Sequence, residues 1–310
     1  MHSLLLSKTR NLKNVLHHQN FIPQNPSRVV LLGGSGFIGQ EISKILTQEN
    51  APILSLSSKE LDLTQESAVD NFSGLLKETD SIVFLSALTP DKGRGIEAFE
   101  KNIKMAVHVV KALERRPVAH LVYFSSDAVY SMKEPLVTEA TLSNPEDLYG
   151  LMHLTREKMM EMAFKNTAIV RPTLVYGEQD THNSYGPNRF RRMAEEKGEI
   201  TLFGDGEEKR DHIFVEDLAR LIVNVLMHKS VGQLNAVTGQ SISYVALAHK
   251  AAALYGEGHV KVTLTERKNP VTHRHFDNTI IFKSFPDFRF TSLEEGLKLV
   301  YDSVSQRVEA

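Results

Sequence analysis

Short apolar runs alternate with amphipathic segments along the first half of the chain. The run RVVLL at 28–32 is rich in β-branched residues and is stopped by glycines, which is typical of a strand buried on both faces of a sheet. After it, Ile38, Ile42, Ile45 and Leu46 recur at helical spacing. Further strands are predicted at 51–58, 81–88, 120–126 and 167–177, and helices at 65–79, 96–116, 147–160 and 215–229.

Strands that alternate with helices form right-handed βαβ units around a parallel sheet. The pattern therefore predicts an α/β fold, a Rossmann-like doubly wound parallel sheet. Beyond Tyr176 the alternation breaks, and residues 178–212 are rich in Gly, Asn, Asp and Arg. Because ligands of open α/β sheets bind at the carboxyl ends of the strands, we expect the later segments to form a smaller C-terminal substrate-binding lobe over that crevice.

Composition and charge exclude several classes of protein. The chain has 310 residues, a formal net charge of -2 and no cysteine. This charge balance gives no reason to expect nucleic acid or an anionic membrane as a partner. The absence of cysteine removes disulfides, thiol nucleophiles and cysteine-ligated metals, and fits a reducing compartment. No apolar run approaches 18 residues, so no membrane span is predicted.

The N-terminus leaves the cellular location open to one alternative. Residues 1–28 contain four Lys or Arg and no Asp or Glu, a composition shared by organelle transit peptides. We favour a cytoplasmic protein in which residues 1–27 form a disordered or docking arm, because FIPQNP is typical of a linker into a domain.

The turn between the first strand and the first helix has the pattern of a phosphate-binding loop. In GGSGFIG, Gly33 allows a tight turn, Gly36 lets the backbone approach a pyrophosphate, and Gly39 lets the helix pack on the strand. The helix N-terminus offers free N–H groups to an anion. We therefore predict a dinucleotide-binding Rossmann domain at 28–178, on which the helix near 215–229 also packs, and a substrate lobe formed mainly by 179–310.

The end of the second strand bears on which dinucleotide is bound. An acidic residue there would accept hydrogen bonds from the adenosine ribose and repel a 2′-phosphate, whereas Ser57, Ser58 and Lys59 suit that phosphate better. Glu60 and Asp62 argue the other way, because either could reach the adenosine. The cofactor is therefore predicted as NADP or NAD, with NADP favoured.

The spacing of GGSGFIG, SSDAVY, YGLMH, RPTLVYG and RDHIFVEDLA resembles the extended short-chain dehydrogenase/reductase family, of the NAD-dependent epimerase/dehydratase type, whose members modify nucleotide sugars. The resemblance runs from about residue 28 to the C-terminus. Five motifs in order are very specific for the fold and much less specific for the substrate.

The resemblance implies roles for matching residues. Tyr149 matches the catalytic acid/base, and Ser126 matches the residue that hydrogen-bonds the reacting oxygen. Asn102 matches a residue that supports the active-site helix, and Arg210 matches an arginine that pairs with the diphosphate of a sugar nucleotide. The implied cofactor contacts are Gly33, Ser35, Gly36, Phe37, Ile38, Gly39, Ser57, Ser58, Lys59, Asp62, Leu63, Ala87, Asn102 and Pro172.

His153 departs from the family pattern, which is Tyr-x-x-x-Lys. Glu157 still fits the usual continuation, so the lysine is truly replaced. An ammonium at roughly 5 Å, in an effective dielectric of about 20, would stabilise a tyrosinate by about 3 kcal/mol. Histidine is mostly neutral at pH 7 and loses most of that stabilisation, although a neutral imidazole can still hydrogen-bond a ribose hydroxyl. Either Tyr149 works at higher pH or through a proton relay that includes His153, or the site has lost chemistry and kept binding.

The block Ser125-Ser126-Asp127-Ala128 separates the possible reactions. A sugar 4,6-dehydratase would usually show Thr-Asp-Glu, and Ala128 replaces that glutamate, so dehydration is disfavoured. An epimerase or a keto-sugar reductase needs only the Ser/Tyr pair, and both remain open. We assign Asp127 to the substrate site together with Arg210, rather than to proton transfer.

Two other hypotheses compete with the interpretation as a nucleotide-sugar enzyme. A non-catalytic NAD(P)-binding accessory or assembly protein would explain the missing lysine, and a reductase of a non-sugar carbonyl would leave Arg210 without a diphosphate partner. No metal site is predicted, because His273, His275 and Asp277 are interpreted as solvated residues on one strand face. The family often forms dimers through two long helices, here those near 96–115 and 149–164, which makes a homodimer the expected assembly.

Overall fold

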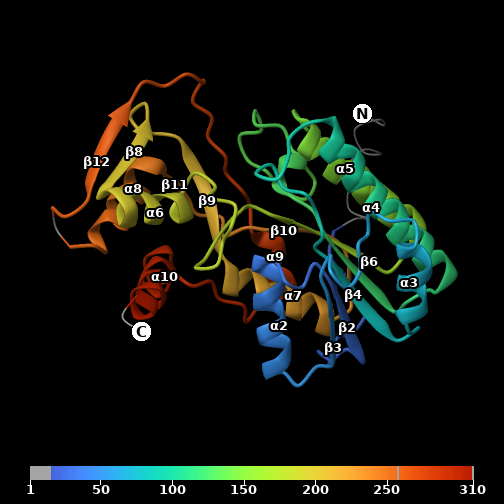
Figure 1. Ribbon diagram of the computed structural model, residues 1–310. Coiled ribbons are helices and arrows are strands. Elements are labelled where there is room, and N and C mark those ends of the chain that lie inside the picture. Colours follow the sequence, from blue (N-terminus) through green and yellow to red (C-terminus); the bar gives the residue numbers. More distant parts are fainter. Residues whose placement is uncertain (1–14, 257, 309–310) are drawn as a thin grey trace, which may run out of the picture.

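A computed structural model describes residues 15–256 and 258–308. Its centre is a seven-stranded sheet in the order β1-β10-β6-β5-β4-β2-β3, in which only β1 runs antiparallel to its neighbour (Figure 1). This arrangement confirms the predicted parallel Rossmann-type sheet. The strands are β1 (His17–His18), β2 (Arg28–Leu32), β3 (Ile53–Leu56), β4 (Asp80–Phe84), β5 (His120–Phe124), β6 (Thr167–Pro172) and β10 (Ser230–Ala236).

Helices cover both faces of the sheet, and each face has its own apolar core. One face carries α2 (Phe37–Gln48), α7 (Val215–Met227) and α9 (Thr279–Ser284), as Figure 1 shows. The other face carries α3 (Ala68–Leu75), α4 (Ile96–Arg115) and α5 (Leu148–Ala163). The buried β-branched and aliphatic residues of the parallel strands face these two helical layers. Because both faces are covered, each strand is a continuous apolar run in the sequence.

The second lobe lies beside the carboxyl ends of the parallel strands and has a separate core (Figure 1). One small sheet consists of β7 (Leu174–Tyr176), β9 (Lys209–Phe214) and β11 (Ser241–Ser243), and another of β8 (Glu199–Phe203) and β12 (Lys261–Thr265). The lobe also contains α6 (Pro187–Lys197), α8 (Tyr244–Ala253) and α10 (Leu293–Val308).

Two predicted elements differ from those observed. The helix expected at 65–79 is shorter, because Asp62 accepts hydrogen bonds from the backbone and hydroxyl of Thr64 and holds the preceding residues in turns. The strand expected at 167–177 breaks after Pro172. The Thr173 hydroxyl donates a hydrogen bond to the backbone carbonyl of Asp211 in the other lobe. The chain therefore passes from the central sheet into the lobe through Thr173.

The central sheet also recruits segments from outside 28–178. β10 is its seventh strand in chain order, and α9 packs against it, so parts of the 179–310 region belong to the Rossmann half. The described part of the N-terminal arm, 15–27, packs on the sheet as well. Leu16 is buried, and His17–His18 pair with β10. Residues 1–14, which carry most of the composition that suggested targeting, lie outside the described residues.

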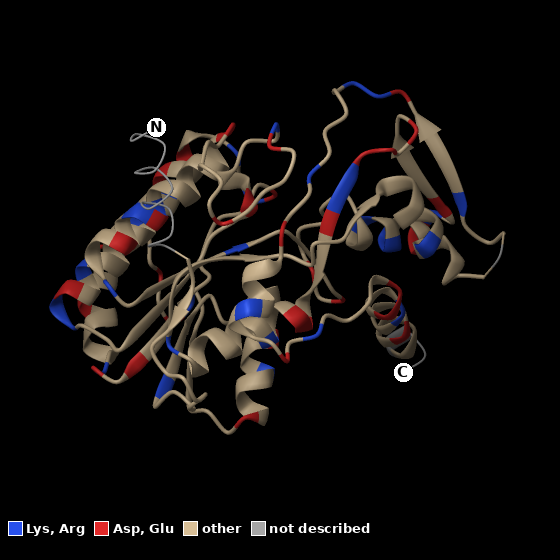
Figure 2. Cartoon of the chain, turned by 180° about the vertical axis from the view of Figure 1, so that it is seen from behind, with Lys and Arg blue, Asp and Glu red and all other residues tan. Residues whose placement is uncertain are grey.

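Charged residues of both signs occur throughout the described part of the chain. Figure 2 shows Lys and Arg interspersed with Asp and Glu over both lobes. Across the same residues, none of the helices combines the length and the hydropathy that a bilayer crossing requires.

Candidate active site

The glycine turn has the shape that a dinucleotide requires. Gly33 has a φ of +90°, and a Cβ added there would lie 3.0 Å from the Ser86 hydroxyl oxygen. A Cβ on Gly39 would lie 2.6 Å from the Gly33 carbonyl oxygen, so only glycine lets α2 pack this closely on the turn. Gly36 caps α2 without a side chain that could occupy the first N–H groups. The exposed Ser35 and the half-buried Phe37 and Ile38 border this end of the helix, which fits a bound pyrophosphate.

Next to the turn, the end of β3 carries two carboxylates that are already hydrogen-bonded. Glu60 accepts from the Ser57 backbone N–H at 2.8 Å and from the Ser57 hydroxyl, and these bonds hold the pKa of Glu60 below its usual value. Asp62 accepts from Thr64, and hydrogen bonding likewise lowers its pKa. Ser58 and Lys59 are exposed, and Leu63 is buried beneath them in the core.

Asn102 fixes the loop that follows β4. Its Oδ1 accepts from the Leu88 N–H at 2.8 Å, and its Nδ2 donates to the Leu88 carbonyl at 3.0 Å. The buried amide of Asn102 therefore supports the segment that contains Ala87, rather than contacting α5 through these atoms. Pro172 lies at the carboxyl end of β6, on the same edge of the sheet.

Ser126, Asp127 and Tyr149 come together where α5 meets the 3-10 helix η2 (Asp127–Val129). Gly150 makes this approach possible, because a Cβ at that position would lie 2.1 Å from the Ala128 carbonyl oxygen. Asp147 caps α5 by accepting from the Gly150 N–H at 2.8 Å. The glycine after the tyrosine is thus required by the close packing of the helix against the loop that carries Ser126.

Burial dominates the acid–base behaviour of Tyr149. Its pKa is raised above the ordinary value mainly by burial and by the nearby Asp127 carboxyl, whereas Arg156 and a hydrogen bond with Ser126 act to lower it. Burial also raises the pKa of Asp127, against the opposing effect of Arg274 and Arg210. Near neutral pH, Tyr149 is therefore a protonated phenol.

His153 is buried beneath Tyr149. The two rings meet edge to face with centroids 4.7 Å apart, and Nδ1 lies 2.8 Å from the hydroxyl of Tyr123 on β5. Burial raises the pKa of Tyr123 and lowers that of His153 well below its usual value, so both groups are neutral. The simplest arrangement has the Tyr123 hydroxyl donating to Nδ1, which leaves the proton on Nε2, a buried atom without a partner.

The lobe side of the site contains two arginines. Arg210 on β9 donates to the Thr272 carbonyl and to the Glu208 carboxylate at 2.5 and 2.8 Å. Arg274, which is buried, places Nε 3.2 Å from Oδ2 of Asp127 and also donates to the Asp127 carbonyl. His273 and His275 flank Arg274 in irregular structure rather than in a strand, and no described cluster of three or more His, Asp or Glu could hold a metal.

Sequence reasoning missed Arg274, Tyr123, Arg156 and the buried pair of Glu157 and Arg171. The last two are joined by hydrogen bonds of 2.8 and 2.6 Å inside the site wall. Arg171 within RPTLVYG and Glu157 were visible as motif positions, but Arg274 is remote in sequence and offered no signal beyond the histidines around it.

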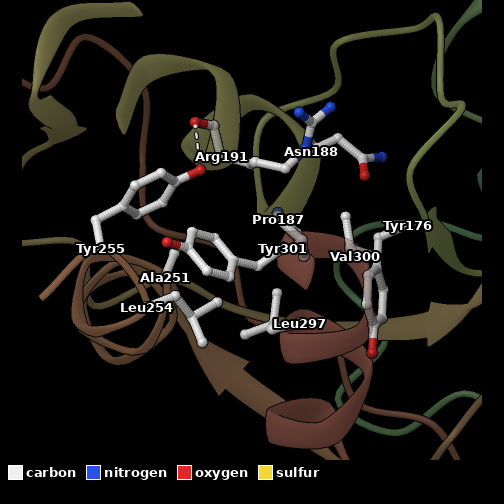
Figure 3. A pocket seen from close by; sticks show the side chains of 10 residues that line it. All are labelled: Tyr176, Pro187, Asn188, Arg191, Ala251, Leu254, Tyr255, Leu297, Val300 and Tyr301. Carbon is white, nitrogen blue, oxygen red and sulfur yellow. Dashed lines mark hydrogen bonds between the residues drawn. The ribbon is translucent and has the colours of Figure 1, made fainter. Parts of the chain in front are cut away.

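Two other hollows lie apart from this cluster. Figure 3 shows a pocket between α6, α8 and α10, lined among others by Tyr176, Arg191, Tyr255 and Tyr301. A wider cleft lies between α2 and α10 and is lined by residues that include Phe37 and Lys44. Neither contains Ser126, Tyr149 or Arg210.

Comparison with known proteins places the chain in a family. Residues 29–237 match the model of the NAD dependent epimerase/dehydratase family. The chain belongs to this family, and the resemblance seen in the motifs is confirmed. The relatives that it matches are enzymes that act on nucleotide sugars.

Individual relatives agree with that assignment. The chain is 26% identical to a GDP-L-fucose synthase from Sinorhizobium fredii, over 91% of this chain and 96% of the relative. A GDP-L-fucose synthetase structure from Naegleria fowleri bound to NADP superposes with a TM-score of 0.82 at 16% identity, covering 95% of this chain and 99% of the other. A UDP-glucose 4-epimerase structure from Thermotoga maritima with UDP-glucose gives a TM-score of 0.77 at 21% identity, covering 91% and 99%.

Proposed function

We propose that this protein is an NAD(P)-dependent enzyme that reduces or epimerises a nucleotide sugar, with Tyr149 as the group that moves the proton. The observation that carries the proposal is the cluster of Ser126, Asp127 and Tyr149 at the sheet edge beside the glycine turn. A pocket that only binds a dinucleotide has no need of a hydroxyl pair beside a half-buried carboxyl. A bound nicotinamide would supply hydride transfer, and the chain's own residues would handle the proton.

The protonation state of Tyr149 favours reduction of a keto sugar. Because burial and Asp127 raise its pKa, the phenol holds its proton near neutral pH and is ready to donate it to a carbonyl oxygen. Ser126 would hydrogen-bond the same oxygen. An epimerase must also remove a proton from an alcohol, which this environment opposes, so the reductive direction is the better supported of the two.

The substrate would lie between the two sides of the site. Arg274 holds Asp127 in place, and Arg210 is the candidate for the diphosphate, as a guanidinium suits paired phosphate oxygens. The relatives named for GDP- and UDP-sugars support a nucleotide sugar as substrate without selecting the base.

For the cofactor, we propose a preference for NADP. Glu60 is occupied by Ser57, and the exposed Lys59 carries the positive charge that would suit a 2′-phosphate. Titration of the protein with NADPH and NADH, and of Lys59→Met with both, tests this proposal. The variant should lose affinity for NADPH by about tenfold and keep its affinity for NADH. Equal losses for both cofactors would remove the role of Lys59.

The activity itself is tested with a panel of UDP-, GDP- and dTDP-sugars and their 4-keto forms, each with NADPH and NADH. Net oxidation of the reduced cofactor would identify a reductase, and isomer formation without net cofactor turnover would identify an epimerase. Tyr149→Phe should lose at least about a hundredfold in rate while still binding cofactor. Cofactor binding without either reaction in the unaltered protein would instead support an accessory protein.

We also propose a homodimer formed through α4 and α5, which pack side by side on one face (Figure 1). Leu148 and Leu151 on α5 are 37% and 43% exposed there. Light scattering after size exclusion should give twice the mass of one chain, and Leu151→Glu should give the monomer. A monomeric unaltered protein would refute the proposal.

A further inference from the structure

A buried arginine lies in the site wall without a carboxylate. Arg156 on α5 is 0% exposed and forms no ion pair with any described residue. Its Nη2 donates to the Ser86 carbonyl at 2.9 Å, and its guanidinium lies over the rings of Phe84 and Tyr123, at 4.3 and 5.2 Å from the centroids. Its Nε has no hydrogen-bond partner among the residues that the structure describes.

The nearest acidic neighbour in sequence does not neutralise it. Glu157 directs both carboxylate oxygens to Arg171 and accepts from the Ser125 hydroxyl at 2.5 Å. Among the described residues, Arg156 is therefore a net positive charge compensated by a carbonyl, the Met152 sulfur at 3.8 Å and two aromatic faces, with no carboxylate. Such a charge opposes folding, because its desolvation is not repaid by an ion pair. Charges of this kind concentrate at functional sites.

The position of Arg156 relates it directly to the unusual histidine. Residues 149, 153 and 156 share one face of α5, at spacings of one helical turn. The ring of Tyr149 contacts His153, His153 hydrogen-bonds the Tyr123 hydroxyl, and the guanidinium of Arg156 lies over the Tyr123 ring. These contacts form a continuous path from the cation to the phenol.

We propose that Arg156 supplies the fixed positive charge that position 153 lacks, and that it favours the tyrosinate form of Tyr149 from beneath the site. The inference rests on the proposed role of Tyr149 as acid/base. Arg156 contacts neither substrate nor reacting atoms in this assignment and is a positioning residue. Because a guanidinium stays charged at every working pH, the field that it provides does not depend on the state of His153.

The electrostatics around Tyr149 agree with this assignment. Burial, the Asp127 carboxyl of η2 and the Asp147 carboxyl at the start of α5 raise the pKa of Tyr149, and Arg156 is the cation that lowers it. Burial first, and Arg156 second, lower the pKa of His153, so the imidazole stays neutral. From the lobe, Arg210 and Arg274 act on Asp127. On β5, Tyr123 is the group that faces His153.

The test compares Arg156→Met, which removes the charge, with Arg156→Lys, which keeps it. Lys158→Met, on the exposed side of the same helix, is the matched control for a general charge effect. The rate at which the enzyme oxidises the nucleotide-sugar alcohol, the reverse of keto-sugar reduction, is followed from pH 6 to 10. Oxidation requires the deprotonated form of the Tyr149 phenol. A unit charge at roughly 10 Å, in an effective dielectric of about 20, changes a pKa by about one unit.

Arg156→Met should therefore move the rising limb of the profile up by about one pH unit and lower the rate at pH 7 by about tenfold. Arg156→Lys and Lys158→Met should leave the limb in place. A profile unmoved in Arg156→Met, in an enzyme that otherwise turns over, overturns the inference but leaves the proposed function intact. An unaltered protein without turnover defeats the proposed function instead.

A second measurement does not need activity. His153→Lys places a second cation beside Arg156 and should lower the urea midpoint, whereas His153→Lys combined with Arg156→Met keeps a single cation and should recover it. This pair also serves if Arg156→Met alone folds poorly. Additive effects of the two substitutions would show that the two positions do not share one electrostatic site, and would overturn the inference.

Discussion

The two sides of the candidate site use buried positive charge in different ways. On the Rossmann side, Arg156 lies among aromatic rings without a carboxylate. On the lobe side, Arg274 pairs with Asp127, and Arg210 is held by Glu208 and Thr272. The family motif identified Arg210, whose donors are largely satisfied within the protein. No motif indicated a role for Arg156, the arginine without an acidic partner among the described residues. Residue type and spacing locate a site, but the partners decide what each charge can do.

The largest effect that separates the two sides should come from the helix that carries the Rossmann side. Gly150→Ala would place a Cβ 2.1 Å from the Ala128 carbonyl oxygen. We expect about 3 kcal/mol lower free energy of unfolding in urea, because neither backbone can move freely. Gly74→Ala in α3 is the control, since nothing lies within 4 Å of its added Cβ, and it should gain about 0.5 kcal/mol. Similar losses in both would rule out the steric explanation.

Acid should act on the lobe side through His212, a buried imidazole on β9 whose two nitrogens form no hydrogen bond with any described residue. Burial lowers its pKa from 6.5 to about 3. The unfolded chain takes up a proton below pH 6.5 that the folded protein refuses, so stability is full above 6.5 and falls by about 1.4 kcal/mol per pH unit toward 3.

His212→Leu removes this proton site, and an apolar side chain suits an environment without hydrogen-bond partners. Urea unfolding at pH 7 and pH 5 should show a loss on acidification that is about 2 kcal/mol smaller than in the unaltered protein. His249→Leu, at an exposed position of α8, should keep the original pH dependence. An unchanged dependence in His212→Leu would contradict the buried neutral imidazole.

On the Rossmann side, His153→Lys should move the activity optimum to lower pH by about two units, since an ammonium beside Tyr149 favours its deprotonated form. The measurement is the pH profile of kcat with the substrate found in the panel. An unchanged profile would count against any charge effect at this position.

The smallest effect should appear on the lobe side, at the diphosphate. Glu208→Gln releases Arg210 from its ion pair, and we expect KM for the nucleotide sugar to fall by about threefold, whereas Arg210→Gln should raise it by about threefold. If KM moves in the same direction in both variants, the diphosphate does not bind at Arg210.

Much of the fold could be predicted because its signals are local. The glycine turn and the apolar runs of β2, β5 and β6 appear at the expected positions, since β-branched runs and helical spacing act over a few residues. The family motifs identified Ser126 and Tyr149, which the structure brings together. Their roles, like those of the other predicted site residues, remain predictions.

The parts that sequence reasoning missed depend on contacts between distant segments. Arg274 reaches Asp127 across 147 residues of chain, and β10 enters the sheet from beyond the lobe boundary. Glu157 on α5 is paired because Arg171 on β6 reaches it. Arg156 on the same helix meets the ring of Phe84 on β4 instead of a carboxylate. No periodicity in one segment carries that information.

The short strand β1 closes one border of the central sheet. His18 bonds to the Ser230 hydroxyl and the Ser284 carbonyl at 2.8 Å each, so the arm is fastened to β10 and α9 together. A recombinant fragment trimmed to begin at Arg28 would leave the outer backbone of β10 without its cover, and such an open border invites strand addition from another molecule. We therefore expect the arm to limit self-association through β10, so a preparation that retains residues 15–27 should stay monodisperse under conditions in which the trimmed one aggregates.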